Sequence, residues 1–283
     1  MGLSGVKEIL RDAAKNKYGV ASFNVFNFES IKWAVLAAEK EGMPVIIQFY
    51  PGFTVHISLK AVAEITIDLA NNAKVPVGLH LDHARDLETA VAGIKAGFRS
   101  VMIDASTFPF AENARITAEV KRVAKVFDAD VEGELGHVGS GSVIDDYTNP
   151  NNFTDPSEVK RFVELTETDS LAVSIGNGHG RYVKAPTLDF ERISAIRAET
   201  DVPLVMHGGS DIPDDQIREA VNRGMGKFNI ATEYARAMFD AQKAAIESNK
   251  DGSFFGVLRA MEEASVSLVI NKIRLLNPNG YKA

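Results

Sequence analysis

Three of the six histidines lie where their imidazoles could meet at one site. His83, His179 and His207 each stand at or just beyond the end of a short apolar run that we expect to be a β-strand. Three neutral imidazoles with one open position are typical of catalytic zinc, whereas structural zinc sites have four protein ligands. The chain has no cysteine, which excludes disulfides and thiolate metal sites. We therefore predict a Zn²⁺ site at these three histidines.

A carboxylate adjoins the first of these ligands. Asp82 precedes His83, and adjacent residues at a strand end can direct one side chain to a metal and the next toward a substrate. Such a carboxylate could exchange a proton with a substrate hydroxyl, or it could support a histidine ligand through a hydrogen bond. His80 should point to the opposite face of the strand from His83 and is expected to be structural. His56 and His137 fall in predicted loops.

Glycines and hydroxyl residues gather beyond the last three apolar runs. Backbone N–H groups beside glycine can approach a phosphate closely, and a following helix N-terminus adds a favourable dipole. Ser210 and Thr232 would contribute hydroxyl donors. Each glycine alone would be explained by a tight turn, but together these segments predict a phosphate site. Its residues are Gly180, Gly208, Gly209, Ser210, Asn229, Ile230, Ala231 and Thr232.

These candidate residues need a scaffold that brings the ends of distant segments together. Short, continuous apolar runs predict strands buried on both faces. The predicted strands are 19–24, 44–48, 77–81, 100–103, 129–134, 170–174, 203–207 and 227–231. Segments with helical periodicity lie between and after them. The predicted helices are 30–41, 59–72, 87–96, 111–127, 156–166, 188–199, 213–223, 233–249 and 254–274.

This alternation predicts an α/β fold, with residues 1–283 forming a single parallel (β/α)8 TIM barrel with extra C-terminal helices. A doubly wound open sheet is the alternative, but the first βα turn lacks its glycine fingerprint. The chemistry of such barrels lies at the carboxyl ends of the strands. Every predicted strand ends in polar residues there, including Asn24, Gln48, Asp104 and Glu134, and we expect Asn24 and Gln48 to contact substrate.

Composition narrows the possible partners. A net charge of −7 over 283 residues argues against nucleic acid or an anionic membrane as the main partner. No stretch approaches the roughly 20 apolar residues of a membrane span. Charged residues interrupt the N-terminal segment, which argues against a signal peptide, so we expect a cytoplasmic protein.

Several motifs in order resemble the class II, metal-dependent ketose-bisphosphate aldolases, and the resemblance runs nearly end to end. The motifs are LHLDHARDLETAVAGIKAGFRSVMIDASTFPFAEN, VEGELG, DSLAVSIGNGHGRY, VPLVMHGGSDIPDDQIREAVNRGMGKFNIATEYARA and VINKIR. Asp211 after the Gly-Gly-Ser segment is similar to the tagatose-bisphosphate branch of that family.

The resemblance implies reversible cleavage of a ketose 1,6-bisphosphate, of tagatose or fructose type, through a zinc-stabilised enediolate. The products would be dihydroxyacetone phosphate and an aldehyde such as glyceraldehyde 3-phosphate. It implies that the three histidines hold zinc, that Asp82 handles the C4 hydroxyl proton, and that the glycine-rich segments bind dihydroxyacetone phosphate. Asp104 and Glu134 match positions for a displaced or second metal. A monovalent cation, Na⁺ or K⁺, a homodimer or homotetramer, and a role in carbohydrate metabolism such as glycolysis are also implied.

Three positions depart from the family pattern. The acidic residues that follow the fifth strand come late, which leaves Asp145 and Asp146 as candidates to move the proton at the enediolate carbon. Tyr50 replaces a serine that helps to hold substrate, and the C-terminal tail lacks a common arginine. A ketose 1-phosphate with another terminal group is therefore an alternative substrate. The candidate replacement cations for a distal phosphate are Arg181, Lys184 and Lys282.

Other chemistries remain as alternatives. A Schiff-base aldolase would need a lysine at the mouth, but Lys227 opens the eighth strand at the opposite end. A barrel metallohydrolase would also use histidines and a carboxylate, but it would not need the phosphate loops. A non-catalytic sugar-phosphate-binding subunit of an aldolase complex would not need the three histidines.

Overall fold

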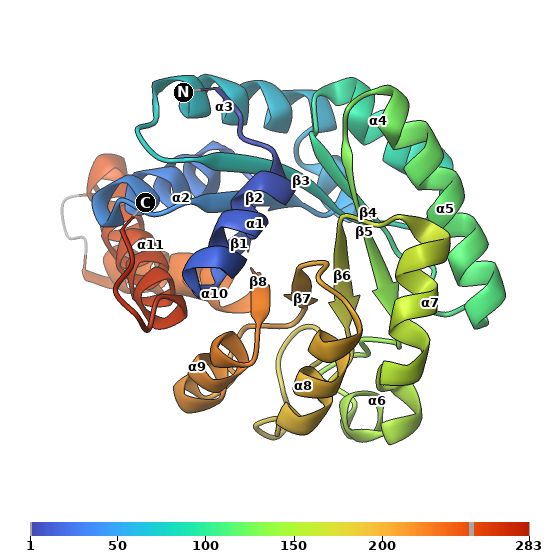
Figure 1. The fold of residues 1–283 in the computed structure, drawn as a ribbon. Coiled ribbons are helices and arrows are strands. Elements are labelled where there is room, and N and C mark those ends of the chain that lie inside the picture. Colours follow the sequence, from blue (N-terminus) through green and yellow to red (C-terminus); the bar gives the residue numbers. More distant parts are fainter. Residues whose placement is uncertain (1, 249–251, 283) are drawn as a thin grey trace.

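Eight parallel strands close into a barrel in sequence order in the computed structural model, which describes residues 2–248 and 252–282 (Figure 1). The strands are β1 (Val20–Asn24), β2 (Val45–Phe49), β3 (Val77–Ala84), β4 (Ser100–Ile103), β5 (Asp130–Leu135), β6 (Ser170–Val173), β7 (Leu204–Met206) and β8 (Met225–Ile230). Because β1 pairs with both β2 and β8, the predicted barrel is confirmed and the open sheet is excluded.

Helices surround the strands at nearly all of the predicted places. They are α1 (Val6–Asn16), α2 (Phe28–Glu41), η1 (Pro51–Val55), α3 (Leu59–Asn72), α4 (Leu87–Ala96), α5 (Phe110–Val126), α6 (Ile144–Thr148), η2 (Pro150–Asn152), α7 (Pro156–Thr166), α8 (Phe190–Glu199), α9 (Asp214–Asn222), α10 (Thr232–Ser248) and α11 (Phe254–Leu276). The predicted end of one helix, Asn249, lies outside the described residues. No described helix is long and apolar enough to cross a membrane.

The sequence reasoning missed α1 and the short helices η1, α6 and η2. Helix α1 buries Val6, Ile9, Leu10 and Ala13 on one stripe and packs against β1, β3 and β8. Charged residues on its other face conceal the stripe when the segment is examined only for long apolar runs.

Helix boundaries follow the expected signals, with one exception. Asp155 accepts a hydrogen bond from the Ser157 amide at the start of α7, and Gly97 ends α4 in the left-handed region. Asp211 lies before Pro213 but does not cap α9, which begins after Pro213 without a side-chain cap. Asp211 itself has a positive φ of 58° and forms an ion pair with Arg236 on α10.

A register irregularity in β3 changes the direction of its last side chains. The pairing of β3 with β4 shifts between Leu81 and Ala84, and His83 has a left-handed φ of 51°. Both Asp82 and His83 therefore face the interior, although they are adjacent in sequence. His80 also lies inside the barrel, completely buried, with its Nδ1 2.8 Å from Ser100 Oγ. The expectation that His80 and His83 occupy opposite faces is wrong because simple alternation fails across this bulge.

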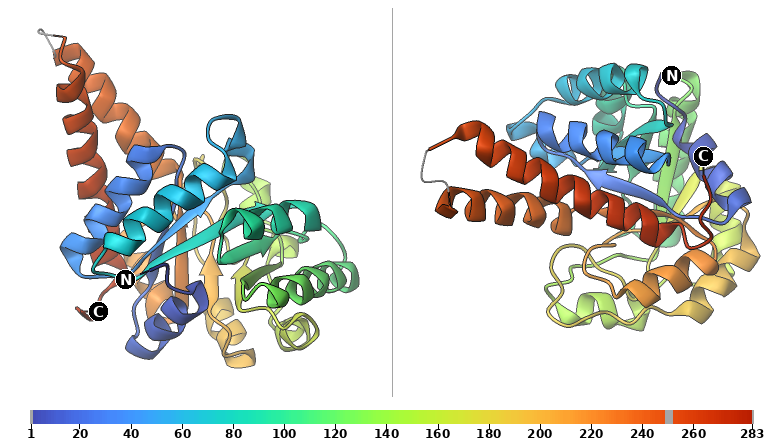
Figure 2. Two further views of the ribbon diagram at one scale, coloured as in Figure 1. Left: turned by 90° about the horizontal axis from the view of Figure 1, so that it is seen from above. Right: turned by 90° about the vertical axis from the view of Figure 1, so that its left-hand side faces the viewer.

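The C-terminal segment returns to the amino end of the barrel. Helices α10 and α11 first form a hairpin that extends beyond the helices around the barrel (Figure 2). At the last residue of α11, the Leu276 carbonyl accepts from the Gly19 amide at 2.7 Å, and beyond the helix Tyr281 stacks on Tyr18 with ring centroids 5.1 Å apart. Because these contacts lie just before β1 begins, Lys282 stands at the end opposite the strand carboxyl ends. It is therefore excluded as the cation for a distal phosphate.

Candidate metal and substrate site

Three imidazoles converge at the carboxyl ends of β3, β6 and β7. His83 Nε2 lies 3.1 Å from His179 Nε2 and 2.9 Å from His207 Nδ1, and the latter two atoms are 3.2 Å apart. Three nitrogens at about 2.0–2.1 Å from a tetrahedral zinc would be about 3.3 Å apart. The donor set and its spacing therefore fit a single divalent metal.

In each histidine, the ring nitrogen that points away from the other two histidines, here called the outer nitrogen, faces a hydrogen-bond acceptor. The pairs are His83 Nδ1 with Asp104 Oδ2 (3.1 Å), His179 Nδ1 with the Val138 carbonyl (3.1 Å) and His207 Nε2 with Glu132 Oε1 (2.9 Å). In a neutral imidazole, an acceptor at the outer nitrogen requires that nitrogen to carry the hydrogen, so the inner nitrogen presents its lone pair. All three rings are thus oriented for metal binding.

Close packing drives the pKa values of His83 and His179 apart. Burial, together with the charges of the neighbouring His83 and His207, lowers the pKa of His179 to about 3. Burial would also lower the pKa of His83, but Asp82 and Asp104 outweigh it and raise the value to about 9. Neighbouring imidazoles therefore cannot all be protonated at once, and a cation at this point would compete with protons.

Asp82 lies beside the three histidines in a buried amide network. Its Oδ2 accepts a hydrogen bond from Asn24 Nδ2 at 2.8 Å, and its Oδ1 accepts one from Asn229 Nδ2 at 3.4 Å. Gln48 Nε2 donates to Asn24 Oδ1 at 2.5 Å. Gln48 is completely buried and orients Asn24, and its contact with substrate remains a prediction. Burial would raise the pKa of Asp82, but the charges of His83 and other neighbours lower it to about 2.

The loops after β6 and β7 are joined tightly. Gly208 has a φ of 62°, and a Cβ there would lie 2.0 Å from the Gly178 carbonyl oxygen. The Tyr182 hydroxyl accepts from the Gly178 amide at 2.8 Å and donates to the Gly208 carbonyl at 2.9 Å. No side chain fits between the loops at Gly208, so glycine is required there.

The loop after β8 completes this side of the mouth. The Gly209 amide donates to the Asn229 carbonyl at 2.8 Å, and Ser210 Oγ accepts from the Glu233 amide at 3.2 Å. Helix α10 thus begins beside the predicted phosphate residues, with Ala231 and Thr232 half-buried. Ile230 is buried, and its contact with a ligand remains a prediction. A Cβ at Gly180 would meet no atom of the described residues within 4 Å, so this position lies open.

Asp104 and Glu134 approach His83 from the other side. These three residues form a second group of donors close enough to hold a metal. Glu134 accepts from the Val138 amide at 3.0 Å through Oε1, and its buried Oε2 has no hydrogen-bond partner among the described residues. Burial raises the pKa of Glu134, and the Asp104 carboxylate raises it further. A ligand role for this pair remains a prediction.

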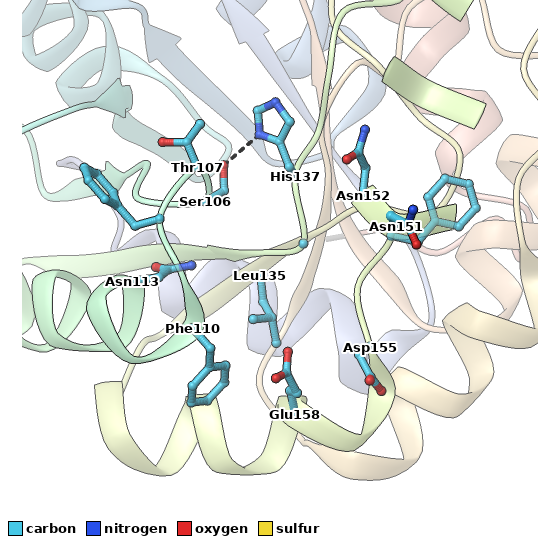
Figure 3. Close-up of a pocket in the computed structure, with 13 residues that line it drawn as sticks. Ser106, Thr107, Phe110, Asn113, Leu135, His137, Asn151, Asn152, Asp155 and Glu158 are labelled. Carbon is cyan, nitrogen blue, oxygen red and sulfur yellow. Dashed lines mark hydrogen bonds between the residues drawn. The ribbon is translucent and has the colours of Figure 1, made fainter. Parts of the chain in front are cut away.

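His137 connects Asp104 to a neighbouring pocket. Its Nδ1 lies 3.0 Å from Ser106 Oγ (Figure 3). Ser106 Oγ in turn donates to Asp104 Oδ1 at 2.8 Å. Ser106 and His137 line a pocket of about 510 Å³ beside the mouth, and none of the three converging histidines lines it. The histidine expected to be a simple loop residue is therefore linked to the outer nitrogen of His83.

Asp145 and Asp146 lie on α6, outside the cluster of histidines. Asp145 is exposed, and Asp146 Oδ2 accepts from the Ser140 amide at 3.2 Å. Ser140 pairs with His179 in an isolated parallel bridge. Within the described residues, neither carboxylate is bonded to His83, His179 or His207. Their proton-transfer role remains a prediction.

Sequence reasoning missed a buried ion pair beneath the histidines. Lys227 Nζ lies 2.7 Å from Glu132 Oε2, and both side chains are 0% exposed. Side chains two residues apart in a strand point to the same face. Because Glu132 lies two residues before Glu134 and Lys227 two before Asn229, this rule could have placed both residues inside the barrel. Lys227 is buried against Glu132, and the absence of a Schiff base remains a prediction.

Comparisons with known proteins agree with this architecture. A family model described as class II fructose-bisphosphate aldolase matches residues 4–281. The crystal structure of the YdjI aldolase from Escherichia coli K12 is 36% identical, with a TM-score of 0.88 over 99% of this chain and 100% of that one. A fructose-bisphosphate aldolase from Campylobacter jejuni is 24% identical, with a TM-score of 0.85 over 98% of this chain and 96% of that one. The latter likeness shows the shared fold.

Proposed function

Because the chain belongs to the class II fructose-bisphosphate aldolase family, we propose that it is a zinc-dependent aldolase acting on a ketose 1,6-bisphosphate of fructose or tagatose type. The products would be dihydroxyacetone phosphate and an aldehyde such as glyceraldehyde 3-phosphate. The observation that carries the proposal is the convergence of His83, His179 and His207 beside the buried Asp82 carboxylate. When bound by the three imidazoles, a divalent ion supplies a Lewis acid for the ketone oxygen.

Asp82 is the proposed acceptor of the C4 hydroxyl proton. Its pKa of about 2 keeps it ionised near neutral pH, and Asn24 and Asn229 fix its orientation. As the proton leaves, the C4 oxygen becomes the aldehyde, the C3–C4 bond breaks, and its electron pair remains with C3. A second group must then deliver a proton to C3, and Asp145 or Asp146 is the proposed carrier.

The loops after β6, β7 and β8 are the proposed site of the C1 phosphate. The Gly208–Ser210 segment adjoins the start of α10, because Ser210 Oγ accepts from the Glu233 amide, and the helix dipole there favours an anion. Gly180, with a positive φ of 84°, would add its backbone N–H group. The segment from Asn229 to Thr232 would complete the site, with Na⁺ or K⁺ as an additional bound cation.

A ketose 1-phosphate with another terminal group is the second candidate substrate. One observation favours it, because the C-terminal tail lies at the opposite end of the barrel from the mouth. Tyr50, where a serine was expected, packs edge-on against Phe53 with ring centroids 5.5 Å apart. The Arg236 hydrogen bond lowers the pKa of Asp211, and the charge of Arg181 adds to this effect, which supports a position for Arg181 on the side proposed for the C1 phosphate.

A coupled retro-aldol assay tests the proposal. Release of dihydroxyacetone phosphate is followed by NADH oxidation with purified chain, before and after chelation and after Zn²⁺ is restored. We expect activity that disappears on chelation and returns with metal, and no inactivation by borohydride with substrate. Activity that survives complete metal removal would contradict the mechanism. Absence of cleavage across ketose mono- and bisphosphates would favour a non-catalytic sugar-phosphate-binding subunit.

The proposed assembly is a homodimer or homotetramer that buries the α10–α11 hairpin. Phe239, Ile246, Phe254 and Phe255 on this hairpin are 59–75% exposed. Large apolar side chains gathered on one projecting element are typical of an interaction surface. Light scattering should give the mass of two or four chains, and replacing Phe254 and Phe255 by serine should reduce it. Val126→Ser, on α5, is the control because Val126 is 80% exposed but lies elsewhere.

A further inference from the structure

The ion pair inside the barrel is connected to one of the converging histidines. Lys227 on β8 and Glu132 on β5 are both completely buried, and Lys227 Nζ lies 2.7 Å from Glu132 Oε2. The other carboxylate oxygen, Oε1, lies 2.9 Å from His207 Nε2. Ser170 Oγ donates to Oε2 at 3.2 Å. The pair therefore has a direct route to His207, in addition to any role in packing.

Donor and acceptor rules give this chain of contacts a direction. An ammonium group can only donate, and an ionised carboxylate can only accept. Glu132, held by Lys227, therefore requires His207 Nε2 to carry the hydrogen. His207 Nδ1 is then left with its lone pair, and this is the atom 2.9 Å from His83 Nε2.

We propose that Lys227 is a positioning residue of the metal site, which acts through Glu132 to fix His207 in the tautomer that can bind a divalent ion. The inference rests on the proposed function in assuming that the three histidines bind metal. It goes further by giving the lysine of the barrel core a role in metal affinity.

Replacing Glu132 by glutamine separates this role from packing. The glutamine amide has one accepting oxygen and one donating NH₂ group. Lys227 can only donate, so it takes the oxygen and leaves the NH₂ group facing His207 Nε2. His207 must then accept at Nε2 and carry its hydrogen on Nδ1, which blocks metal binding. The Ser170 hydroxyl can donate or accept and does not impose an orientation.

The double variant Glu132→Gln with Lys227→Met reverses the constraint. Without the ammonium group, the amide can rotate and present its oxygen to His207 Nε2. The tautomer that binds metal is then allowed again. A second substitution that improves metal binding is the signature of this mechanism, because damage to packing would accumulate.

Metal affinity of the full-length, metal-free protein is the test. Zn²⁺ and Co²⁺ binding is measured by competition with a chelating dye, the Co²⁺ absorption spectrum reports the ligand set, and circular dichroism monitors folding. We expect Glu132→Gln to weaken binding about 10–100-fold, the range for groups that orient metal ligands. The double variant should bind at least about tenfold more tightly than Glu132→Gln.

Two further variants complete the design. Lys227→Met alone should also weaken binding, because Glu132 loses the donor that holds it, and it remains informative if Glu132→Gln does not fold. Lys121→Met is the matched control, because Lys121 pairs with the buried Asp169 and has no contact with the histidines. It should lower thermal stability and leave metal affinity unchanged.

The outcomes separate the inference from the proposed function. A double variant no tighter than Glu132→Gln, or Lys227→Met with wild-type affinity, would overturn the role of Lys227 while the proposed metal site stands. A wild-type chain that binds neither Zn²⁺ nor Co²⁺ would overturn the metal site itself and the inference with it.

Discussion

The structure contains two buried carboxylate–lysine clusters, one near the strand amino ends and one deeper in the barrel, and we expect them to have different roles. Near the strand amino ends, the Asp169 side chain is 3% exposed and pairs with Lys7 at 2.5 Å and with Lys121. Deeper in the interior, Glu132 pairs with Lys227 at 2.7 Å. The chemistry of the two clusters is the same, but their remaining contacts differ.

The two clusters differ in the group that each carboxylate contacts besides lysine. Asp169 accepts from the Val131 amide at 2.8 Å and so joins α1, α5, β5 and β6. Glu132 instead contacts His207 at 2.9 Å, one step from the proposed metal. Residues at the amino ends of such a barrel serve stability, and those at the carboxyl ends serve chemistry. We expect substitutions to separate along this line.

The largest effect should come from removing a converging histidine. His179→Ala deletes one of three inner nitrogens and should reduce cleavage to background, together with bound metal. Its thermal unfolding without metal should change little, because the ring's remaining bond is to the Val138 carbonyl. Metal content by mass spectrometry and the coupled assay give the two readouts. Full activity in a metal-free variant would contradict the metal mechanism.

Asp82→Asn should have the next largest effect. The substitution keeps the size of the side chain but removes its basicity, so turnover should fall about 10²–10⁴-fold. Bound zinc should be retained, because Asp82 Oδ1 lies 3.9 Å from His83 Nε2 and outside hydrogen-bond distance. Loss of zinc in proportion to activity would show that Asp82 supports the ligand.

At the amino end, Asp169→Asn should reverse this pattern. The variant leaves two lysines without their buried partner and should lower the free energy of unfolding by about 2–4 kcal/mol. The loss is limited because Lys7 is partly exposed and water solvates its charge. The kcat/KM of the folded enzyme should be unchanged. Urea unfolding and the coupled assay measure the two quantities. A large loss of kcat/KM would contradict the view that the Asp169 cluster serves stability alone.

The same variant has a defined pH dependence. Burial would raise the pKa of Asp169, but hydrogen bonds from Lys121, Lys7 and the Val131 amide outweigh it and lower the pKa. A lowered pKa means that the stabilisation is fully present above the unfolded value of about 3.9 and is lost as pH falls further. The stability difference between wild type and Asp169→Asn should therefore be constant near neutrality and shrink below about pH 4.

The smallest effect concerns the far end of the substrate. With Lys282 at the other end of the barrel and Tyr50 packed on Phe53, we expect no strong clamp for a second phosphate. Removing the terminal phosphate from a ketose 1,6-bisphosphate should lower kcat/KM less than about 10²-fold, the loss expected for a well-formed ion pair of about 3 kcal/mol. A preference above about 10³-fold would reveal a clamp at the mouth.

The sequence alone determined the barrel and the main members of its site. Short β-branched runs separated by helical periods are local signals, and the three candidate metal ligands lie at or just beyond the ends of such runs. The convergence of His83, His179 and His207 could be predicted because the parallel strands of a barrel end at one face. Gly208 could be recognised as part of a tight turn because its requirement for positive φ is local.

Only the tertiary structure decided how these residues are aimed and supported. The bulge in β3, which turns both Asp82 and His83 inward, depends on pairing with β4 and leaves no mark in the alternation of residues. Glu132 meets Lys227 across 95 positions of sequence and His207 across 75. Such contacts depend on where distant strands lie in the closed barrel, and local periodicity carries no information about which side chains meet there.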